Sequence, residues 1–343
     1  MKPTVKSFLV RALAVLLLVA PLVLPAAALE ADELVPIGRT AGIKLYADGV
    51  IVTDFSELRT PDGYDSPARR AGLQPGDIIT RCNGQTIKTA DALANALATS
   101  QGEAELTVLR GGKTISCRVA PVRDSSGVAR IGALVRDSLA GIGTITFYDP
   151  ASGTFGALGH GICESETGVL VPIDAGALIP AVITEIRRGA AGKPGELVGH
   201  FDLTAEAGEL GENLDTGLYG KIGCNDLYPE LLSAAAIPVA EPDEVQRGAA
   251  EILANVSGDR VERFAVEITE IELTRETKNF VLRVTDPALL ARTGGIVQGM
   301  SGSPILQNGR IVGAVTHVLI NDPTKGYGIF IENMLEAAEN GIN

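Results

Sequence analysis

The sequence predicts a mainly β protein in which a small α+β module precedes a larger β domain. Glycine is abundant, at 40 of 343 residues, while aromatic residues make up 4% and tryptophan is absent, a balance that suits short strands and tight turns. Short apolar runs separated by turn residues recur along the chain, and helical patterning is sparse. A chain of this length can bury two separate cores.

Residues 1–29 read as a targeting segment. Basic residues precede an apolar run over 12–29 that contains two prolines and ends in three alanines. This pattern is typical of a signal peptide, or of a single N-terminal membrane anchor if the segment is retained. We therefore expect the rest of the chain to be exported, either secreted or held at a membrane.

Charge and cysteine content exclude several classes of protein. The net charge of -13 argues against a nucleic-acid partner, since phosphate binding needs a concentrated basic surface. No C-x-x-C spacing suggests a metal site or redox chemistry, and no cofactor is implied. Cys82 and Cys117 fall in predicted strands of one module, where they either pair or remain two buried thiols.

The first predicted module spans residues 34–122. Two strand-like runs flank a turn at Asp48-Gly49, and residues 66–79 predict a short helix, a Pro-Gly turn and the start of a strand. Thr89 can cap a helix over 90–98. A hairpin over Gly111-Gly112 completes the module.

The ordered set A-x-x-A-G-L-x-P-G-D-x-I from Ala68, followed by N-G and the capped helix, resembles a bacterial PDZ domain. The resemblance implies a groove between this helix and a strand that starts at Ile43, in which a partner's C-terminus or internal segment adds as a strand. The expected groove residues are Gly42, Ile43, Lys44 and Leu45. Alternatively, the module only braces the following domain.

Residues 129–343 form the second predicted domain, behind a polar linker over 123–128. Many short strands at close spacing indicate a barrel or a sandwich. Helical patterning is confined mainly to 242–253 and 332–339.

The segment Gly299-Met300-Ser301-Gly302-Ser303-Pro304 carries the strongest chemical signal. Its glycines allow a turn that exposes a serine hydroxyl and directs backbone N–H groups at a developing oxyanion. With the following strands, the segment resembles the second barrel of trypsin-like serine proteases. That resemblance implies a double β-barrel, Ser301 as the nucleophile, and an oxyanion hole formed by the N–H groups of Gly299 and Ser301.

A serine nucleophile needs a general base and a group that orients it. His160 lies in a glycine-rich segment that keeps an imidazole accessible, so it is the favoured base, with His317 and then His200 as alternatives. Asp286, at a strand end before Pro287, is the favoured orienting carboxylate. Three competitors lie between His160 and Ser301 in the sequence, namely Asp174, Asp202 and Asp215.

A targeting segment, one PDZ-like module, G-A-L-G-H-G and T-G-G-I-V-Q-G-M-S-G-S-P-I together resemble the stage IV sporulation protein B (SpoIVB) peptidase family. The resemblance supports His160, Asp286 and Ser301 as the functional set. It implies a self-processing endopeptidase in the space between the two forespore membranes. Its substrate would be a regulator of an intramembrane protease complex, and the cut would lead to activation of a late sigma factor.

Two rival functions remain. An HtrA-like quality-control protease shares the PDZ module and the serine turn, but places the protease before the PDZ domain. A non-catalytic adaptor would use the PDZ module to bind a membrane protein and the β domain as a scaffold.

Overall fold

A computed structural model describes residues 33–60, 63–124, 126–164, 168–202, 205–222 and 234–341. The predicted targeting segment over 1–29 and Cys224 lie outside the described residues. Within the described ranges, no helix is long and apolar enough to cross a membrane.

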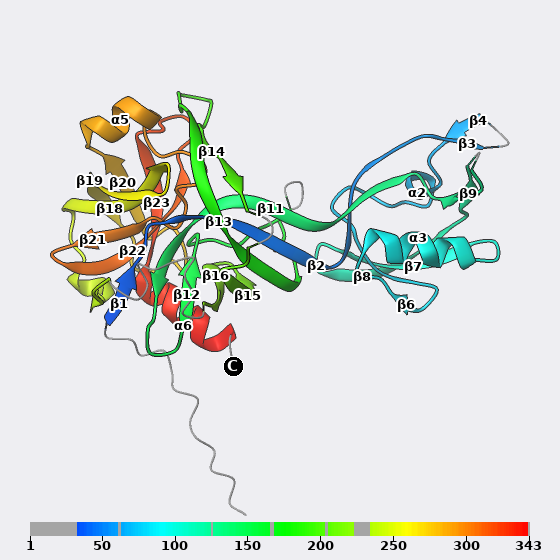
Figure 1. Cartoon of the computed structure of the whole chain (residues 1–343), viewed down its shortest axis with the longest axis horizontal. Coiled ribbons are helices and arrows are strands. Elements are labelled where there is room, and N and C mark those ends of the chain that lie inside the picture. The colour runs from blue at the N-terminus through cyan, green and yellow to red at the C-terminus, as the bar shows by residue number, and fades with distance from the viewer. Residues whose placement is uncertain are drawn as a thin grey trace, which may run out of the picture.

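Two long strands run through both halves of the molecule, β2 (Thr40–Phe55) and β11 (Ala133–Tyr148). They pair antiparallel from Ala133↔Phe55 to Thr144↔Thr40. Figure 1 shows two packed barrels at one end of this ribbon and a smaller domain at the other. The smaller domain is therefore joined to the barrels by continuous sheet rather than by a flexible linker.

The first barrel is a closed ring of strands in the order β2, β11, β12, β16, β15, β13 and back to β2. Its other bounds are β12 (Thr154–Ala157), β13 (Ile173–Arg187), β15 (Gly208–Leu214) and β16 (Gly217–Lys221). Phe155, Leu178 and Leu218 are fully buried in its core. Beside the ring, β14 (Glu196–Phe201) extends β13.

The second barrel is also closed, with the strand order β18-β19-β20-β23-β22-β21. Phe280 and Phe330 meet edge to face in its core. The strands are β18 (Gly248–Ser257), β19 (Arg260–Ile271), β20 (Phe280–Val284), β21 (Pro304–Gln307), β22 (Arg310–Val318) and β23 (Lys325–Phe330). Helix α5 (Pro287–Thr293) follows β20, and α6 (Ile331–Gly341) ends the described chain. Between the barrels, β1 (Glu33–Pro36) pairs with β11 and with β17 (Ile237–Pro238).

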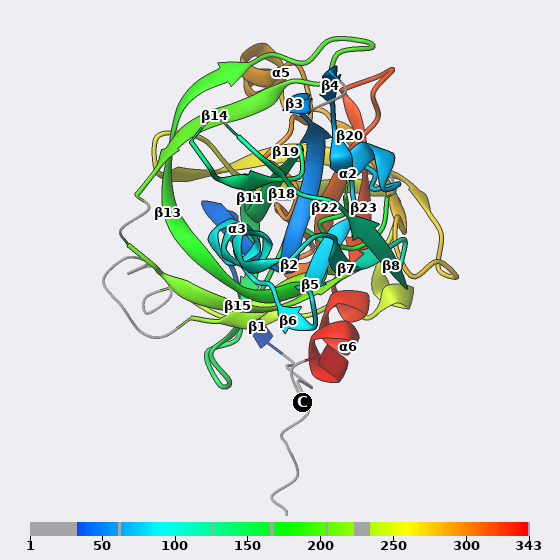
Figure 2. The ribbon, with the colours of Figure 1, turned by 90° about the vertical axis from the view of Figure 1, so that its right-hand side faces the viewer.

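The inserted domain, as we call residues 48–137, uses the far halves of β2 and β11. Leu73, Ile79 and Leu106 belong to its own buried core. Its elements are β3 (Leu58–Thr60), β4 (Gly63–Asp65), α2 (Pro67–Arg70), β5 (Ile78–Cys82), β6 (Gln85–Thr86), α3 (Ala90–Thr99), β7 (Ala104–Arg110), β8 (Lys113–Val119), β9 (Val122–Arg123) and β10 (Ala129–Arg130). Figure 2, viewed from this end, shows α3 and β5 in front of the barrels. The described cysteines of this domain, Cys82 and Cys117, are free, buried thiols, and burial raises the pKa of both.

The domain arrangement differs from the predicted one, in which a module at 34–122 precedes a domain at 129–343. The first half of β2 pairs with β13 as well as with β11, so it is a strand of the first barrel. The PDZ-like domain is thus inserted between the first two strands of that barrel and does not precede it. The predicted linker over 123–128 leads back into β11 rather than into a separate domain.

Two local predictions were also wrong. Asp48-Gly49 does not close a hairpin, because Gly49 (φ +141°) lies inside the continuous strand β2 where it passes from the barrel to the inserted domain. A Cβ at Gly49 would lie 2.8 Å from the Ile79 carbonyl oxygen, so only glycine fits this crossing. The helical pattern over 242–253 gives a 3-10 turn at Pro242–Glu244 and then β18, because β19 and β21 pair with β18 to close the barrel.

Candidate active site

The Ser301 turn lies between α5 and β21, at the edge of the second barrel. Gly299 (φ +97°) and Gly302 (φ +95°) adopt backbone angles that favour glycine. Met300 N–H donates to the Val297 carbonyl, and Gly302 N–H donates to the Val315 carbonyl. In the described part of the chain, the N–H groups of Gly299 and Ser301 donate to no acceptor. The turn therefore presents two unpaired N–H groups beside the serine.

Thr144, on β11 of the first barrel, ties the Ser301 turn across the barrel interface. Its hydroxyl donates to the Gly299 carbonyl at 2.7 Å, and its N–H donates to the Ser301 carbonyl at 2.9 Å. The Ser301 hydroxyl donates to the Thr316 carbonyl of β22. The nucleophile candidate is thus held by both barrels, and no sequence pattern marked Thr144 for this role.

Gly302 allows the close contact between the barrels, so its replacement has a large expected cost. A Cβ there would lie 2.0 Å from the Thr144 carbonyl oxygen and 2.6 Å from the Leu158 nitrogen. We expect Gly302→Ala to lower the free energy of unfolding by about 3 kcal/mol, from a positive φ and a backbone clash together. Urea denaturation measures this loss.

Gly309→Ala is the matched control, because Gly309 also has a positive φ (+78°) but a Cβ there would meet nothing within 4 Å. It should cost only about 1 kcal/mol, from the backbone angle alone. Equal losses in the two variants would show that the barrels do not meet at Gly302.

His160 follows β12 at the edge of the first barrel, after a strained turn. Leu158 has φ +70°, and Gly159 N–H donates to the Ala157 carbonyl at 2.9 Å, which makes Leu158 the centre of a γ-turn. Leu158 N–H also donates to the Thr144 carbonyl. The same Thr144 that ties down the serine turn therefore anchors the turn that carries His160.

Asn213, on β15, fixes the chain just after His160. Its side-chain oxygen accepts a hydrogen bond from Ile162 N–H, and its nitrogen donates to the carbonyls of Ile162 and Val171. The amide accepts one hydrogen bond and donates two at once, which neither a hydroxyl, with its single O–H, nor an ionised carboxylate, which only accepts, can do. A lone Asn in a strand gives no sequence signal of this role.

The His160 ring packs against the ring of His317, with centroids 4.5 Å apart. Thr316 and His317 together lie opposite the single residue Tyr327 in the β22–β23 pairing, a β-bulge. His160 Nδ1 lies 2.9 Å from the Gly161 carbonyl oxygen. With Nδ1 donating to that carbonyl, Nε2 is the nitrogen left to act as a base.

Burial lowers the pKa of both histidines from the usual 6.5, and the positive charge of Lys278 adds to the effect. For His317 the pKa falls to about 4, with the charge of His160 as a further cause. Both imidazoles are therefore neutral at pH 7, the state that a general base requires. Ser301 and His160 both lie in described ranges, and no hydrogen bond joins them in this structure.

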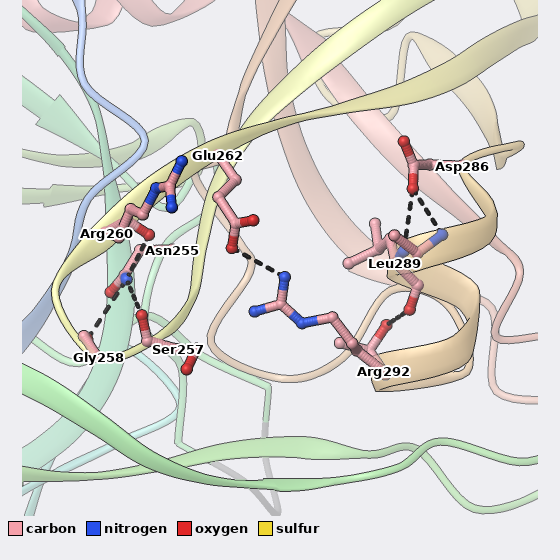
Figure 3. Close-up of polar contacts among 10 residues, drawn as sticks. Asn255, Ser257, Gly258, Arg260, Glu262, Asp286, Leu289 and Arg292 are labelled. Atoms are coloured by element: carbon pink, nitrogen blue, oxygen red, sulfur yellow. Dashed lines mark hydrogen bonds and ion pairs between the residues drawn. The ribbon is translucent and has the colours of Figure 1, made fainter.

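The other predicted triad members lie elsewhere. His200 is exposed on β14, opposite Val182. Asp286 caps α5: one carboxylate oxygen accepts from the N–H groups of Ala288 and Leu289, as Figure 3 shows, and the other accepts from Ala265 N–H. Figure 3 also shows Arg292 of α5 bound to Glu262 of β19.

No carboxylate in the described ranges hydrogen-bonds to His160. Asp174 forms an ion pair with Lys88 of the inserted domain, and Asp215 is exposed in the β15–β16 turn. His160 packs against His317, and Ser301 bonds the carbonyl of Thr316, the residue before His317, whereas Asp286 is held at the start of α5. The orienting contact on His160 is the Gly161 carbonyl.

The predicted peptide groove at Gly42, Ile43, Lys44 and Leu45 is wrong. These residues lie in the first barrel, where β2 pairs with β11 on one edge and with β13 on the other, so no edge is open for a peptide. A cavity of about 300 Å³ instead separates α3 from residues 129–135, with Leu93 and Leu97 among its lining residues. This is the place in the inserted domain where a strand could pack beside the helix.

Comparisons with known proteins match the inserted domain to PDZ domains. A PDZ domain model matches residues 63–110. Mitochondrial serine protease HTRA2 from Drosophila persimilis is 41% identical over 56 residues, which is 16% of this chain and 13% of that protein. The chain thus matches only a small part of the length of this curated relative.

Two solved structures are similar in part. The PDZ domain of an SdrC-like protein from Listeria innocua is 22% identical, with a TM-score of 0.21 over 25% of this chain and 93% of that one. The HtrA-type protease AlgW with a decapeptide is 10% identical, with a TM-score of 0.36 over 90% of this chain and 65% of that one. A family model described as SpoIVB peptidase S55 matches residues 127–335, more than half of the sequence, and with this match the chain belongs to the SpoIVB peptidase S55 family of serine peptidases.

Proposed function

We propose that this peptidase makes a regulated, site-specific cut in a protein substrate, with Ser301 as nucleophile and His160 as general base. The observation that carries the proposal is the set of hydrogen bonds made by Thr144, which hold both the Ser301 turn and the His160 turn. Rigid positioning of a nucleophile and a base from separate elements is what acyl transfer requires.

In the proposed mechanism, rotation about χ1 moves the Ser301 hydroxyl from the Thr316 carbonyl to His160 Nε2. Catalytic hydrogen bonds often form only when substrate is bound. Nε2 then takes the hydroxyl proton as Oγ attacks the scissile carbonyl carbon. The free N–H groups of Gly299 and Ser301 stabilise the resulting oxyanion.

The later steps complete the cycle. Imidazolium of His160 gives its proton to the leaving amine, which departs and leaves an acyl ester on Ser301. A water, deprotonated by the same Nε2, attacks this ester, and the acid product leaves as Ser301 Oγ takes the proton back from the imidazolium. The Gly161 carbonyl bound to Nδ1 stabilises the imidazolium; we retain Asp286 as the family-based candidate for this role, which would require it to leave the α5 cap.

We further propose that the substrate is a membrane-associated regulator of an intramembrane protease in a sporulation pathway. The enzyme would be exported to the space between the forespore membranes, held by residues 1–29 if they are retained, and would process itself. Family membership supports this placement. The insertion of the PDZ domain inside the barrel, unlike an appended one, favours dedicated regulation over bulk quality control.

A fluorophosphonate probe tests the catalytic proposal on the full chain. The probe should label the protein, and peptide mapping should place the adduct on Ser301. Labelling should be lost when the protein is unfolded first, because an isolated serine hydroxyl is a weak nucleophile. Absence of labelling in the folded protein, or an adduct at another residue, would favour a non-catalytic adaptor.

A further inference from the structure

A cavity of about 420 Å³ lies between the inserted domain and the first barrel. The barrel contributes Ile43, Leu139 and Ile162 to its lining, and the inserted domain contributes Thr53, Pro75 and Gly76. This volume is in the range of sites that bind small molecules or several side chains. Neither part of the molecule forms the cavity alone.

The base of this cavity is firmly packed. A small buried cluster joins Ile51 and Ile78 of the inserted domain to Ala47 and Val171 of the barrel, and Leu139 packs against it. Gly76 N–H donates to the Val52 carbonyl, and Val52 N–H donates to the Asp77 carbonyl. The cavity is thus a pre-formed site between parts that are packed together.

The cavity borders the loop that follows His160. Ile162 and Cys163, two and three residues after His160, line it together with Gly141. The next residue, Ile142, lies against Gly299, where an added Cβ would be 3.2 Å from an Ile142 methyl group. A polypeptide that leaves the catalytic site beside the His160 loop would therefore enter this cavity.

Between the cavity and the catalytic site, one edge of β11 is open. Both backbone groups of Thr144 point away from β2, since its N–H donates to the Ser301 carbonyl and its carbonyl accepts from Leu158 N–H. The β2–β11 register is regular from Ser138 to Thr144, so the backbone groups of Ile142 and Ala140 point the same way. No other described strand pairs with this edge before β12 does so at Ile145.

We propose that the leaving-group side of the substrate binds here as an extended strand. It pairs with the free backbone groups of Ala140 and Ile142 and places apolar side chains in the cavity, so the inserted domain forms part of the substrate site. The inference rests on the proposed function, because His160 protonates the leaving amine and its loop borders this side. The predicted specificity is for apolar residues two to four positions beyond the cut.

The first test uses the full chain and a proteome-derived peptide library, with cut sites read by mass spectrometry. Wild type should show apolar enrichment beyond the cut. Thr53→Trp, which fills the cavity from an exposed position, should lower cleavage of these peptides about tenfold. Thr114→Trp, at an exposed position on β8 outside the cavity, is the matched control and should cleave as wild type does.

The second variant is Ala140→Pro. It removes an N–H group that has no partner in the free protein, so the ladder with β2 is kept while pairing with substrate is lost. Peptide cleavage should fall about tenfold. Fluorophosphonate labelling is measured in parallel, because the small probe reports on Ser301 without occupying the cavity.

The outcomes separate the two proposals. If wild type is not labelled, the proposed function fails and the inference fails with it. If labelling is normal but Thr53→Trp and Ala140→Pro retain the wild-type preference and rate, only the inference is overturned. Should Thr53→Trp fail to fold, Ala140→Pro alone decides.

Discussion

Replacing Ser301 by Ala is expected to lower the rate of peptide-bond hydrolysis by about 10⁴-fold to 10⁶-fold. The change removes the only atom that forms the covalent acyl intermediate in the proposed mechanism. It should hardly affect the fold, since the hydroxyl makes one hydrogen bond, to the Thr316 carbonyl, worth about 1 kcal/mol. Single-turnover cleavage of a library-derived peptide and thermal unfolding measure the two effects.

Ser303→Ala provides the control two residues away. The Ser303 hydroxyl is buried and has no hydrogen-bond partner, so its loss leaves no group unpaired. Hydrolysis should remain within about twofold of wild type, because Ser303 is not part of the proposed mechanism. Hydrolysis by Ser301→Ala at a similar rate would contradict the assignment of the nucleophile.

Local sequence signals predicted the elements that depend on neighbouring residues. Thr89 caps α3 through its hydroxyl, as its position predicted, and Gly111-Gly112 joins β7 to β8. The glycines around Ser301 and His160 marked both turns for the same reason: residues there need positive φ angles or close backbone contacts. These backbone requirements depend on residues that are adjacent in the chain, so a single sequence is enough to predict them.

Long-range pairing could not be predicted in this way. The first half of β2 carries alternating apolar residues and is followed by Asp48-Gly49, a pattern that a hairpin would also produce. Its partners β11 and β13 begin about 90 and 130 residues later, and only their register shows that β2 closes a barrel. The insertion of the PDZ domain, and the loss of the predicted groove at Gly42–Leu45, both follow from this pairing.

Asp286 shows how one local pattern can serve two roles. An Asp before Pro at a strand end suits an orienting carboxylate, and it equally suits a helix N-cap with Pro at the first helical position. The structure has the second arrangement, in which both carboxylate oxygens accept backbone hydrogen bonds. Thr144 and Asn213 gave no signal at all, because most of the partners that define their roles lie 40 to 160 residues away.

Replacing His160 by Gln is expected to lower hydrolysis by about 10⁴-fold, since Gln cannot accept the Ser301 proton. His317→Gln keeps the base and loses only a ring contact, so its rate should stay within about tenfold of wild type. The pair decides which of the two adjacent imidazoles is the base, and equal losses would contradict the assignment to His160.

The pH dependence of kcat/KM tests whether the pKa of His160 is lowered in the working enzyme. Burial and the charge of Lys278 lower the pKa of His160 below the usual 6.5, with no carboxylate among the described residues to raise it. Because only the neutral imidazole accepts a proton, activity should be full at pH 7 and should fall only as the pH drops through that lowered pKa. His317→Gln should keep this acid limb below pH 6.5. A limb centred above 6.5 in wild type would instead mean that a carboxylate, such as Asp286 released from the α5 cap, pairs with His160 in the working enzyme.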